Sequence, residues 1–495
     1  MSDRILRPTL AVLALIAILS LLFVAGTQAA TRLEGVSARQ TIPATLPPAT
    51  IATIPPTLPV TPNEEPTGRI VLPLILRVDD SATQGAAEAR PWPVTHRGIH
   101  VFNDQLTQGT SAEQVTFCAT HYAGTQKMIR CEADRLRTVN PDIMILHYRL
   151  GHALGYRGIQ GDCSPTGGYI QIISGDEWIQ EWPGEATLQE SWFYHWPESS
   201  QTRLLNCDWG WYLMEIDNPA WRAHWQAEVL AQVQANDDDG VFLDSLSVPN
   251  YLGPTHFDPN LPAVDATFEA AWARRIEDWL TWLQTQPLGD YWLVPNVGSW
   301  ITTRDATLYE AADGMMIEGF ALEADASPYP LFDWRLQMER MIEASKRGQA
   351  LIAQSYAIDP QERMFTLGCY LLVKGDHTYL NIEDGLDPEW WPEYDLPIGA
   401  PTRGVTQIDD LVIENSVLYG RLYDNARVLV NPTSPWDGSG QTVNVTLSTT
   451  HYLAETAGGG VVPESGIPNG SVSYRTVDEI TLAPYSAAVL FYERP

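Results

Sequence analysis

Short apolar runs alternate with helical patterns over the central part of the chain, residues 68–405. The runs are apolar on both faces, as is typical of parallel strands that are covered by helices. Eight such runs lie at 98–103, 115–121, 142–148, 240–244, 291–296, 314–318, 350–355 and 377–381. Helical patterns follow several of them, at 127–139, 219–235, 266–286 and 333–347. Because no GxGxxG motif is present, the alternation predicts an α/β fold of the (β/α)8 TIM-type barrel class rather than a dinucleotide-binding fold.

The pattern changes after residue 405, where only strand-like runs remain. Gly, Asn and Pro separate these runs, which lie at 411–413, 417–423, 426–431, 442–447 and 487–492. Such spacing predicts an all-β sandwich over residues 406–495. We expect this sandwich to pack as a cap on the barrel, and carbohydrate binding is the alternative.

The first residues predict the compartment. Arg4 and Arg7 precede an apolar run over 10–26, and small residues follow at 27–30. This layout is typical of a secretory signal peptide over residues 1–30. An uncleaved membrane anchor is the alternative, since the run is at the lower edge of the ~17–25 residues that span a bilayer. Residues 31–67 are rich in Pro and Thr and predict an extended linker. In both cases the rest of the chain is secreted or tethered outside the cytoplasm.

Charge and cysteine content exclude several classes of function. The chain has 61 acidic and 30 basic residues, a net charge of −31, which disfavours binding to nucleic acid or to anionic lipid. Its 18 Trp and 20 Tyr suit the apolar faces of sugars. Five cysteines show no zinc spacing, and neither HExxH nor an EF-hand loop occurs, so we expect no metal and no cofactor. We expect a disulfide between Cys163 and Cys207, and a buried, inert Cys369.

Nearly every predicted strand ends in a polar residue, and in a barrel these ends meet at one mouth. Two carboxylates follow apolar runs directly: Asp244 after 240–243, and Glu318 after 314–317. Glycoside hydrolysis needs such a pair, one acid and one nucleophile or base. Met, Ile and Phe beside Glu318 disfavour its ionised form, so we assign Glu318 as acid/base and Asp244 as nucleophile. The alternative is that each carboxylate caps a helix or pairs with Arg.

Other polar and aromatic residues near the strand ends are candidates for substrate contacts. An insertion at 151–218 is too long for an ordinary loop and rich in aromatic residues, so we expect it at the mouth. Its rings either stack on sugar or pack the insertion against itself. The residues expected to bind substrate are His147, Arg149, Trp209, Trp211, Asn296, Phe320, Gln354, Tyr356 and Asn381.

The chain resembles a known family at several motifs. Residues 121–128 (HYAGTQKM), Asn140-Pro141 and residues 146–150 (LHYRL) resemble the hypothetical glycosyl hydrolase family 15, and the motifs at 239–244 and 317–320 fit that family as well. The resemblance covers roughly residues 95–495 and implies an amylase-like barrel with a glycosidase role. In amylase-like barrels the nucleophilic Asp follows strand four, which matches Asp244. The acid there follows strand five, whereas Glu318 follows strand six by our count.

These observations predict a secreted or surface-tethered glycoside hydrolase that cleaves an oligosaccharide or polysaccharide, with retention of the anomer. We expect a monomer whose partner is its carbohydrate substrate. One alternative is a non-catalytic carbohydrate-binding barrel. A deacetylase or a lyase is a further alternative, against which the missing metal pattern and the absence of a basic cluster at the mouth both count.

Overall fold

The computed structural model describes residues 89–106, 109–156, 168–172, 174, 179–181, 188–196, 201–206, 209–249, 266–301 and 306–495. The predicted signal peptide or anchor, the linker, and the Cys163–Cys207 pair lie outside these residues. Within them, no helix has both the length and the hydrophobicity needed to cross a membrane. Cys369 is fully buried, as expected, and burial raises the pKa of its thiol well above the usual value.

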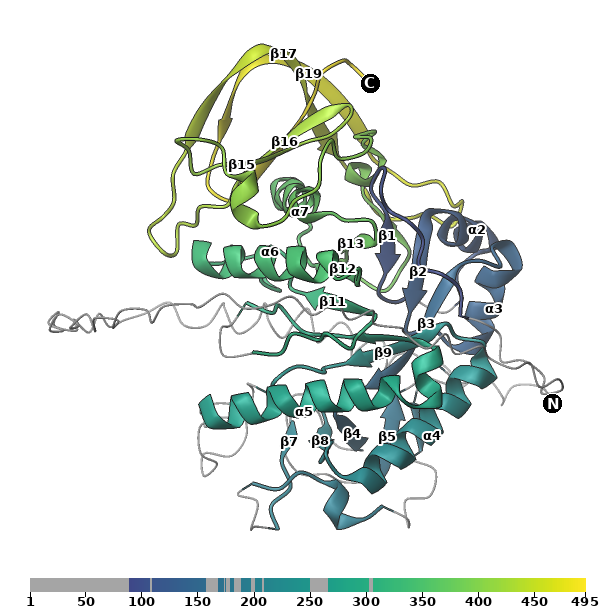
Figure 1. Cartoon of the computed structure of the whole chain (residues 1–495). Helices are drawn as coiled ribbons and strands as arrows, with labels where there is room; N and C mark the ends of the chain where they lie inside the picture. Colours follow the sequence, from purple (N-terminus) through teal and green to yellow (C-terminus); the bar gives the residue numbers. More distant parts are fainter. Residues whose placement is uncertain are drawn as a thin grey trace, which may run out of the picture. The chain divides into compact units, whose positions relative to one another are not determined.

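Eight parallel strands form the barrel, as the alternation predicts (Figure 1). They are β1 (Val101–Asn103), β2 (Tyr122–Gln126), β3 (Met144–Leu150), β9 (Gly240–Asp244), β10 (Trp292–Pro295), β11 (Gly314–Glu318), β12 (Ala350–Ser355) and β13 (Thr378–Ile382). Their order in the sheet is β10-β9-β3-β2-β1-β13-β12-β11. A parallel bridge between Asn296 and Met316 joins the two outer strands, β10 and β11, and so brings the sheet round on itself.

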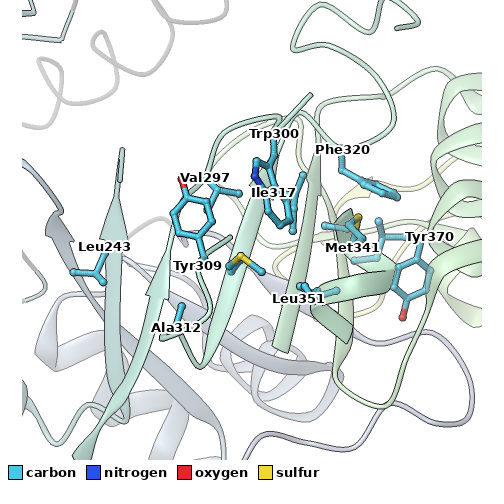
Figure 2. Packing of buried hydrophobic residues seen from close by; sticks show 14 of the residues in the cluster. Leu243, Val297, Trp300, Tyr309, Ala312, Ile317, Phe320, Met341, Leu351 and Tyr370 are labelled. Atoms are coloured by element: carbon cyan, nitrogen blue, oxygen red, sulfur yellow. The ribbon is translucent and has the colours of Figure 1, made fainter. Parts of the chain in front are cut away.

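Alternate residues of each strand point into the barrel or out toward the helices. Phe102, Met144, Leu146, Phe242 and Met316 belong to one buried apolar cluster, which fills the interior. Neighbouring residues in the same strands belong to a second cluster, which packs against the helices. Figure 2 shows part of this second cluster, with Leu243, Ile317 and Leu351 of the strands beside Trp300, Phe320, Met341 and Tyr370.

Helices surround the strands, and local capping explains several of their starts. They are α2 (Ala112–His121), α3 (Arg130–Val139), α4 (Pro219–Asn236), α5 (Ala266–Gln284), α6 (Leu331–Lys346) and α7 (Pro360–Val373). Asn218 accepts hydrogen bonds from the amides of Ala220 and Trp221, and Pro219 occupies the first turn of α4. A reciprocal capping box between Asp359 and Glu362 starts α7.

One predicted strand is wrong. Residues 115–121 belong to helix α2, and the second barrel strand is the less apolar segment that follows, β2. A short apolar run suits a strand or a buried helix equally well. The helix forms here because Ser111 and Gln114 make a reciprocal capping box at its start. The predicted helix at 127–139 accordingly begins later, at Arg130.

The insertion carries a small antiparallel sheet of its own, with the order β6-β5-β4-β8-β7. Its strands are β4 (Ala153–Tyr156), β5 (Tyr169–Ile172), β6 (Ile179–Glu181), β7 (Leu205–Asn206) and β8 (Trp211–Leu213). Trp192, Phe193, Tyr194 and Trp211 of the insertion are all buried. Most described aromatic rings of the insertion therefore pack the insertion against itself, which was the alternative to stacking on sugar.

Antiparallel sheets follow the barrel, as expected. The larger one has the order β15-β16-β20-β17-β19, and β14 (Glu389–Trp390) pairs with β18 (Gly460–Val461). The strands of the larger sheet are β15 (Tyr419–Leu422), β16 (Ala426–Asn431), β17 (Val443–Ala457), β19 (Ser471–Leu482) and β20 (Ser486–Phe491). The run at 411–413 forms no strand of this sheet, and the sequence pattern missed β19, in which many side chains are exposed.

The larger sheet packs against helix α7 (Figure 1). A Cβ added at Gly368 would lie 2.4 Å from the Cβ of Ala487 in β20, so the small residue permits this close approach. The buried guanidinium of Arg421 donates to the carbonyls of Leu371, Leu372 and Lys374, at 2.8–3.1 Å. These carbonyls lie at the C-terminal end of α7 and at its C-cap, Lys374, where they have no partner within the helix. A cation there supplies hydrogen bonds and interacts favourably with the helix dipole.

We expect Gly240→Ala to destabilise the protein by about 1–3 kcal/mol, the usual range for overpacking. The added Cβ would lie 2.4 Å from the carbonyl oxygen and 2.6 Å from the Cβ of Trp292 in the neighbouring strand. Equilibrium unfolding of the full chain in denaturant measures the change. Gly404→Ala is the matched control, because nothing lies within 4 Å of its Cβ position. Equal stability of the two variants would contradict the tight packing of β9 against β10.

Candidate active site

Every barrel strand contributes an inward polar residue at or just after its C-terminal end. Within β9, for example, Phe242 points inward, so Asp244 two residues later does so as well. The same alternation makes Tyr148 the inward residue that follows Leu146. The inward polar residues around the mouth are Asp104, Gln126, Tyr148, Asp244, Asn296, Glu318, Gln354, Tyr356, Asn381 and Glu383.

One amide group joins the two predicted catalytic carboxylates. The side-chain nitrogen Nδ2 of Asn296 donates to Oδ1 of Asp244 at 2.9 Å and to Oε2 of Glu318 at 2.6 Å. Its oxygen Oδ1 accepts from the amide of Gly298 at 3.0 Å, which orients the group with its nitrogen toward the acids. Because both contacts share one nitrogen, the two carboxylate oxygens lie no more than about 5.5 Å apart.

Asp244 receives two further hydrogen bonds. The hydroxyl of Tyr148 donates to its Oδ2 at 2.6 Å, and the backbone amide of Ser245 donates to its Oδ1 at 2.8 Å. Ser245 has a positive φ of 55°, a left-handed conformation that is uncommon outside Gly and Asn. Both oxygens of Asp244 are thus held in place by named donors, and its side chain is only partly buried.

Glu318 lies in an environment that favours its protonated form. Burial raises the pKa of Glu318, and the charge of Asp244 raises it further, against the opposing effects of Lys127, Tyr356 and Asn296. The hydroxyl of Tyr356 donates to its Oε1. A partly buried carboxylic acid with a raised pKa can deliver a proton near neutral pH.

A lysine that the strand pattern did not single out reaches the mouth. Lys127 follows β2, and its Nζ donates to Oδ2 of Asp104 at 2.6 Å, with side-chain exposures of 18% and 5%. Burial lowers the pKa of Lys127, but Asp104, Asp244, Glu318 and Glu383 more than offset this, so its pKa is raised above the usual value. The ammonium therefore stays charged.

A second polar cluster lies at the ends of β12 and β13. Gln354 donates to Glu383 at 2.7 Å, and Asn381 donates to Gln354 at 2.8 Å. All three side chains are buried. Burial and the charge of Asp104 raise the pKa of Glu383 well above its usual value. The three side chains of this cluster thus hydrogen-bond to one another at the mouth.

The structure brings four of the nine expected substrate contacts to the mouth. Asn296 and Tyr356 contact the Asp244–Glu318 pair directly, and Gln354 and Asn381 lie in the neighbouring cluster. Trp209 on the insertion is half exposed, at 53%. The remaining four residues lie elsewhere: His147, Arg149, Trp211 and Phe320.

The expected substrate contacts of His147 and Arg149 need correction. His147 is fully buried, and its Nδ1 lies 2.9 Å from Oδ2 of Asp238. Arg149 contacts Gln171, and burial lowers the pKa of Arg149 to about 10. Both residues alternate with Tyr148, so they point out of the barrel while Tyr148 points in.

Trp211 and Phe320 also lie away from the pair. Trp211 is 4% exposed, with its ring centroid 5.7 Å from that of His152. Phe320 is fully buried in the cluster that faces the helices (Figure 2). The aromatic character of these residues serves packing, which residue type alone does not distinguish from sugar binding.

Five residues of the mouth were missed as site residues: Asp104, Gln126, Lys127, Tyr148 and Glu383. The signal for Tyr148 and Glu383 was the parity of the strand, since each lies two residues after an inward residue, Leu146 or Asn381. Lys127 had no such signal, because its position depends on a left-handed backbone after β2, with a φ of 55°. Among the described residues, no group of three or more His, Cys, Asp or Glu side chains is placed to hold a metal ion.

The mouth of this (β/α)8 barrel holds two carboxyl groups that share one amide donor. Such an arrangement is typical of the glycoside hydrolase class. The sequence profile of the hypothetical glycosyl hydrolase family 15 matches residues 137–427, more than half of the chain. The protein belongs to this family. Comparison with curated proteins gives no significant match.

Solved structures that resemble the chain do so at low identity. A cycloisomaltooligosaccharide glucanotransferase from Paenibacillus sp. is 10% identical, with 80% of this chain and 55% of that chain covered and a TM-score of 0.33. An α-amylase from Geobacillus thermoleovorans is 12% identical (79% and 97% covered, TM-score 0.33). A type I pullulanase from Bacillus subtilis is 10% identical (84% and 72% covered, TM-score 0.38). The chain spans about half the length of the first of these, 55%.

We expect Asn296→Ala to raise the pKa of Glu318 further, because it removes a donor to the carboxylate. Infrared or 13C NMR titration of the carboxyl groups measures this without any substrate, with Glu318→Gln identifying the signal. Asn444→Ala, at an exposed position of β17, is the control and should leave the signal unmoved. An unchanged or lowered pKa in Asn296→Ala would show that the amide does not stabilise the charged form of Glu318.

Proposed function

We propose that the protein hydrolyses glycosidic bonds in an oligosaccharide or polysaccharide, with Glu318 as general acid/base and Asp244 as nucleophile. The observation that carries this proposal is the amide of Asn296, which holds both carboxylates within hydrogen-bond distance of one nitrogen. Two acids in that spacing, at the open end of a barrel, suit attack on one face of a sugar and protonation of its leaving oxygen.

The two environments support different roles for the two acids. Glu318 has a raised pKa and can keep its proton until the leaving oxygen takes it. Asp244 accepts from Tyr148, Asn296 and Ser245, which orient its two oxygens for attack at the anomeric carbon. The attack forms a glycosyl ester on Asp244 as Glu318 protonates the departing oxygen. Glu318, now a carboxylate, then takes a proton from the water that hydrolyses the ester.

The spacing supports retention of the anomeric configuration. Retaining enzymes hold their carboxyl groups about 5–5.5 Å apart, and inverting enzymes hold them about 6.5–9.5 Å apart to leave room for water. The shared donor limits one pair of oxygens, Oδ1 of Asp244 and Oε2 of Glu318, to about 5.5 Å, which supports a close approach of the two carboxyl groups. Glu318 is the last residue of the sixth barrel strand, β11, and Asn296 directly follows the fifth, β10. The roles thus follow the amylase-like resemblance at Asp244 and depart from it at Glu318.

We also propose that the enzyme works outside the cytoplasm, secreted or tethered, and as a monomer. The basis for the location is the sequence of residues 1–30, with its apolar run between arginines and small residues. A carbohydrate polymer outside the cell is a substrate consistent with that location.

Asp244→Asn and Glu318→Gln should each lower turnover at least about 100-fold, the smaller end of what a positioned acid or base contributes. A screen of soluble glycans for new reducing ends, with the full chain, first finds a substrate. Asp376→Asn is the control, since this exposed carboxylate pairs with His96 outside the mouth. Near-normal turnover in either site variant would remove its assigned role. Binding of several glycans without cleavage of any would instead favour a carbohydrate-binding barrel.

The first product should retain the anomeric configuration of the substrate bond. Proton NMR of the anomeric signals, recorded before mutarotation, distinguishes the two outcomes. The same measurement on Asp376→Asn should give the same anomer as the unchanged chain. An inverted product would make Asp244 a base that activates water, and the Asp244–Glu318 gap would then have to open toward about 6.5–9.5 Å in the complex.

A further inference from the structure

We propose that the ammonium of Lys127 is a positioning group for the Asp244–Glu318 pair, acting through the ring of Tyr148 and through its field on both carboxylates. This inference rests on the proposed function. Lys127 touches neither carboxylate by a hydrogen bond that the structure shows, so it would act on the reaction through its neighbours. Among the described residues, Lys127 is the cation that the carboxylates of the mouth share.

The backbone presents Lys127 at a conformational cost. Its φ of 55° lies in the left-handed region, directly after β2, although the side chain carries a Cβ. Such conformations persist where the surrounding structure holds them, and they cluster at functional sites. Asp104 holds the other end of the side chain, at 2.6 Å, and Gln126 donates to the second oxygen of Asp104.

The ammonium lies near the ring that orients Asp244. Nζ of Lys127 is 5.7 Å from the centroid of Tyr148 and 5.4 Å from that of Phe242, both within the range of cation–π attraction. The hydroxyl of Tyr148 donates to Asp244 at 2.6 Å. Lys127 thus helps to fix the ring whose hydroxyl holds the nucleophile.

The field of Lys127 also balances the burial of Glu318. The groups that face the ammonium come from several strands around the mouth: Asp104, Tyr148, Asp244, Glu318 and Glu383. Burial and the charge of Asp244 raise the pKa of Glu318, and Lys127 is the largest influence that lowers it. Without that influence Glu318 would hold its proton too firmly to serve as the base of the second step.

A purely structural ion pair with Asp104 makes a different prediction. If the pair only stabilises the fold, Lys127→Met and Asp104→Asn should act alike. If Lys127 positions the acids, the two variants should not shift the pKa of Glu318 in the same direction. Lys127→Met removes the cation and raises the pKa of Glu318, whereas Asp104→Asn leaves the cation with one fewer carboxylate and does not raise it.

The test is a carboxyl titration of Glu318 by 13C NMR in the full chain, with Glu318→Gln to identify the signal. Lys127→Met should shift the titration upward, and Lys127→Arg should keep it near its original position because the charge remains. The chain has three lysines, and exposed Lys346 on α6 supplies the control: Lys346→Met makes the same change in net charge far from the mouth. If Lys127→Met fails to fold, the double variant with Asp104→Asn removes both charges and should still shift the titration upward.

The kinetic arm uses the glycan substrate. Lys127→Met should lower kcat about tenfold or more with little change in KM, and the fall in kcat/KM at alkaline pH should move to higher pH. Upward titration without cleavage of any glycan would overturn the proposed function, and with it the catalytic use of Lys127, but not its field on Glu318. Cleavage with an unmoved titration in Lys127→Met, or with equal shifts in Lys127→Met and Asp104→Asn, would overturn the positioning role alone.

Discussion

Side chains alternate between the two faces of a strand, and in a barrel one of those faces is the interior. Every inward residue below the mouth is therefore committed to packing, as Phe102, Leu146 and Phe242 are. The next inward position along each strand reaches the open end. Asp244 and Tyr148 are polar for that reason, and His147, one residue earlier, belongs to the helix-facing side. This alternation decides which residues reach the mouth, and so it limits which side chains can take part in chemistry there.

Charge at the mouth is tolerated because it is shared. Asp244 and Glu318 are close enough to repel one another, and the two hydrogens of one amide on Asn296 separate them. Burial raises the pKa of Glu318 and so favours its neutral form, and the ammonium of Lys127, which Asp104 anchors, balances negative charge at the mouth. A buried carboxylate without such partners would cost several kcal/mol. The same contacts that allow the two carboxylates to lie close together also give them different surroundings.

The C-terminal sheet and the insertion are held by hydrogen bonds and packing contacts of common kinds. Arg421 of the C-terminal sheet satisfies the last carbonyls of α7, and Gly368 lets β20 approach the helix closely. The insertion buries its own aromatic rings in a small sheet. These contacts explain why a chain so rich in Trp and Tyr presents few of them at the pair.

The sequence by itself determined the barrel, the antiparallel sheets after it and the placement of Asp244 and Glu318 at strand ends, because strand length, strand-end polarity and helix caps are local features. It determined Asn296 and Tyr356 near the pair for the same reason. It did not determine that 115–121 is helical, since an apolar run of that length suits either state until the Ser111 cap is counted. Only the tertiary structure decided which strand-end residues face inward, that one amide bridges Asp244 and Glu318, and that Lys127 joins them. Those contacts link residues of different barrel strands, and their distances arise only when the barrel closes.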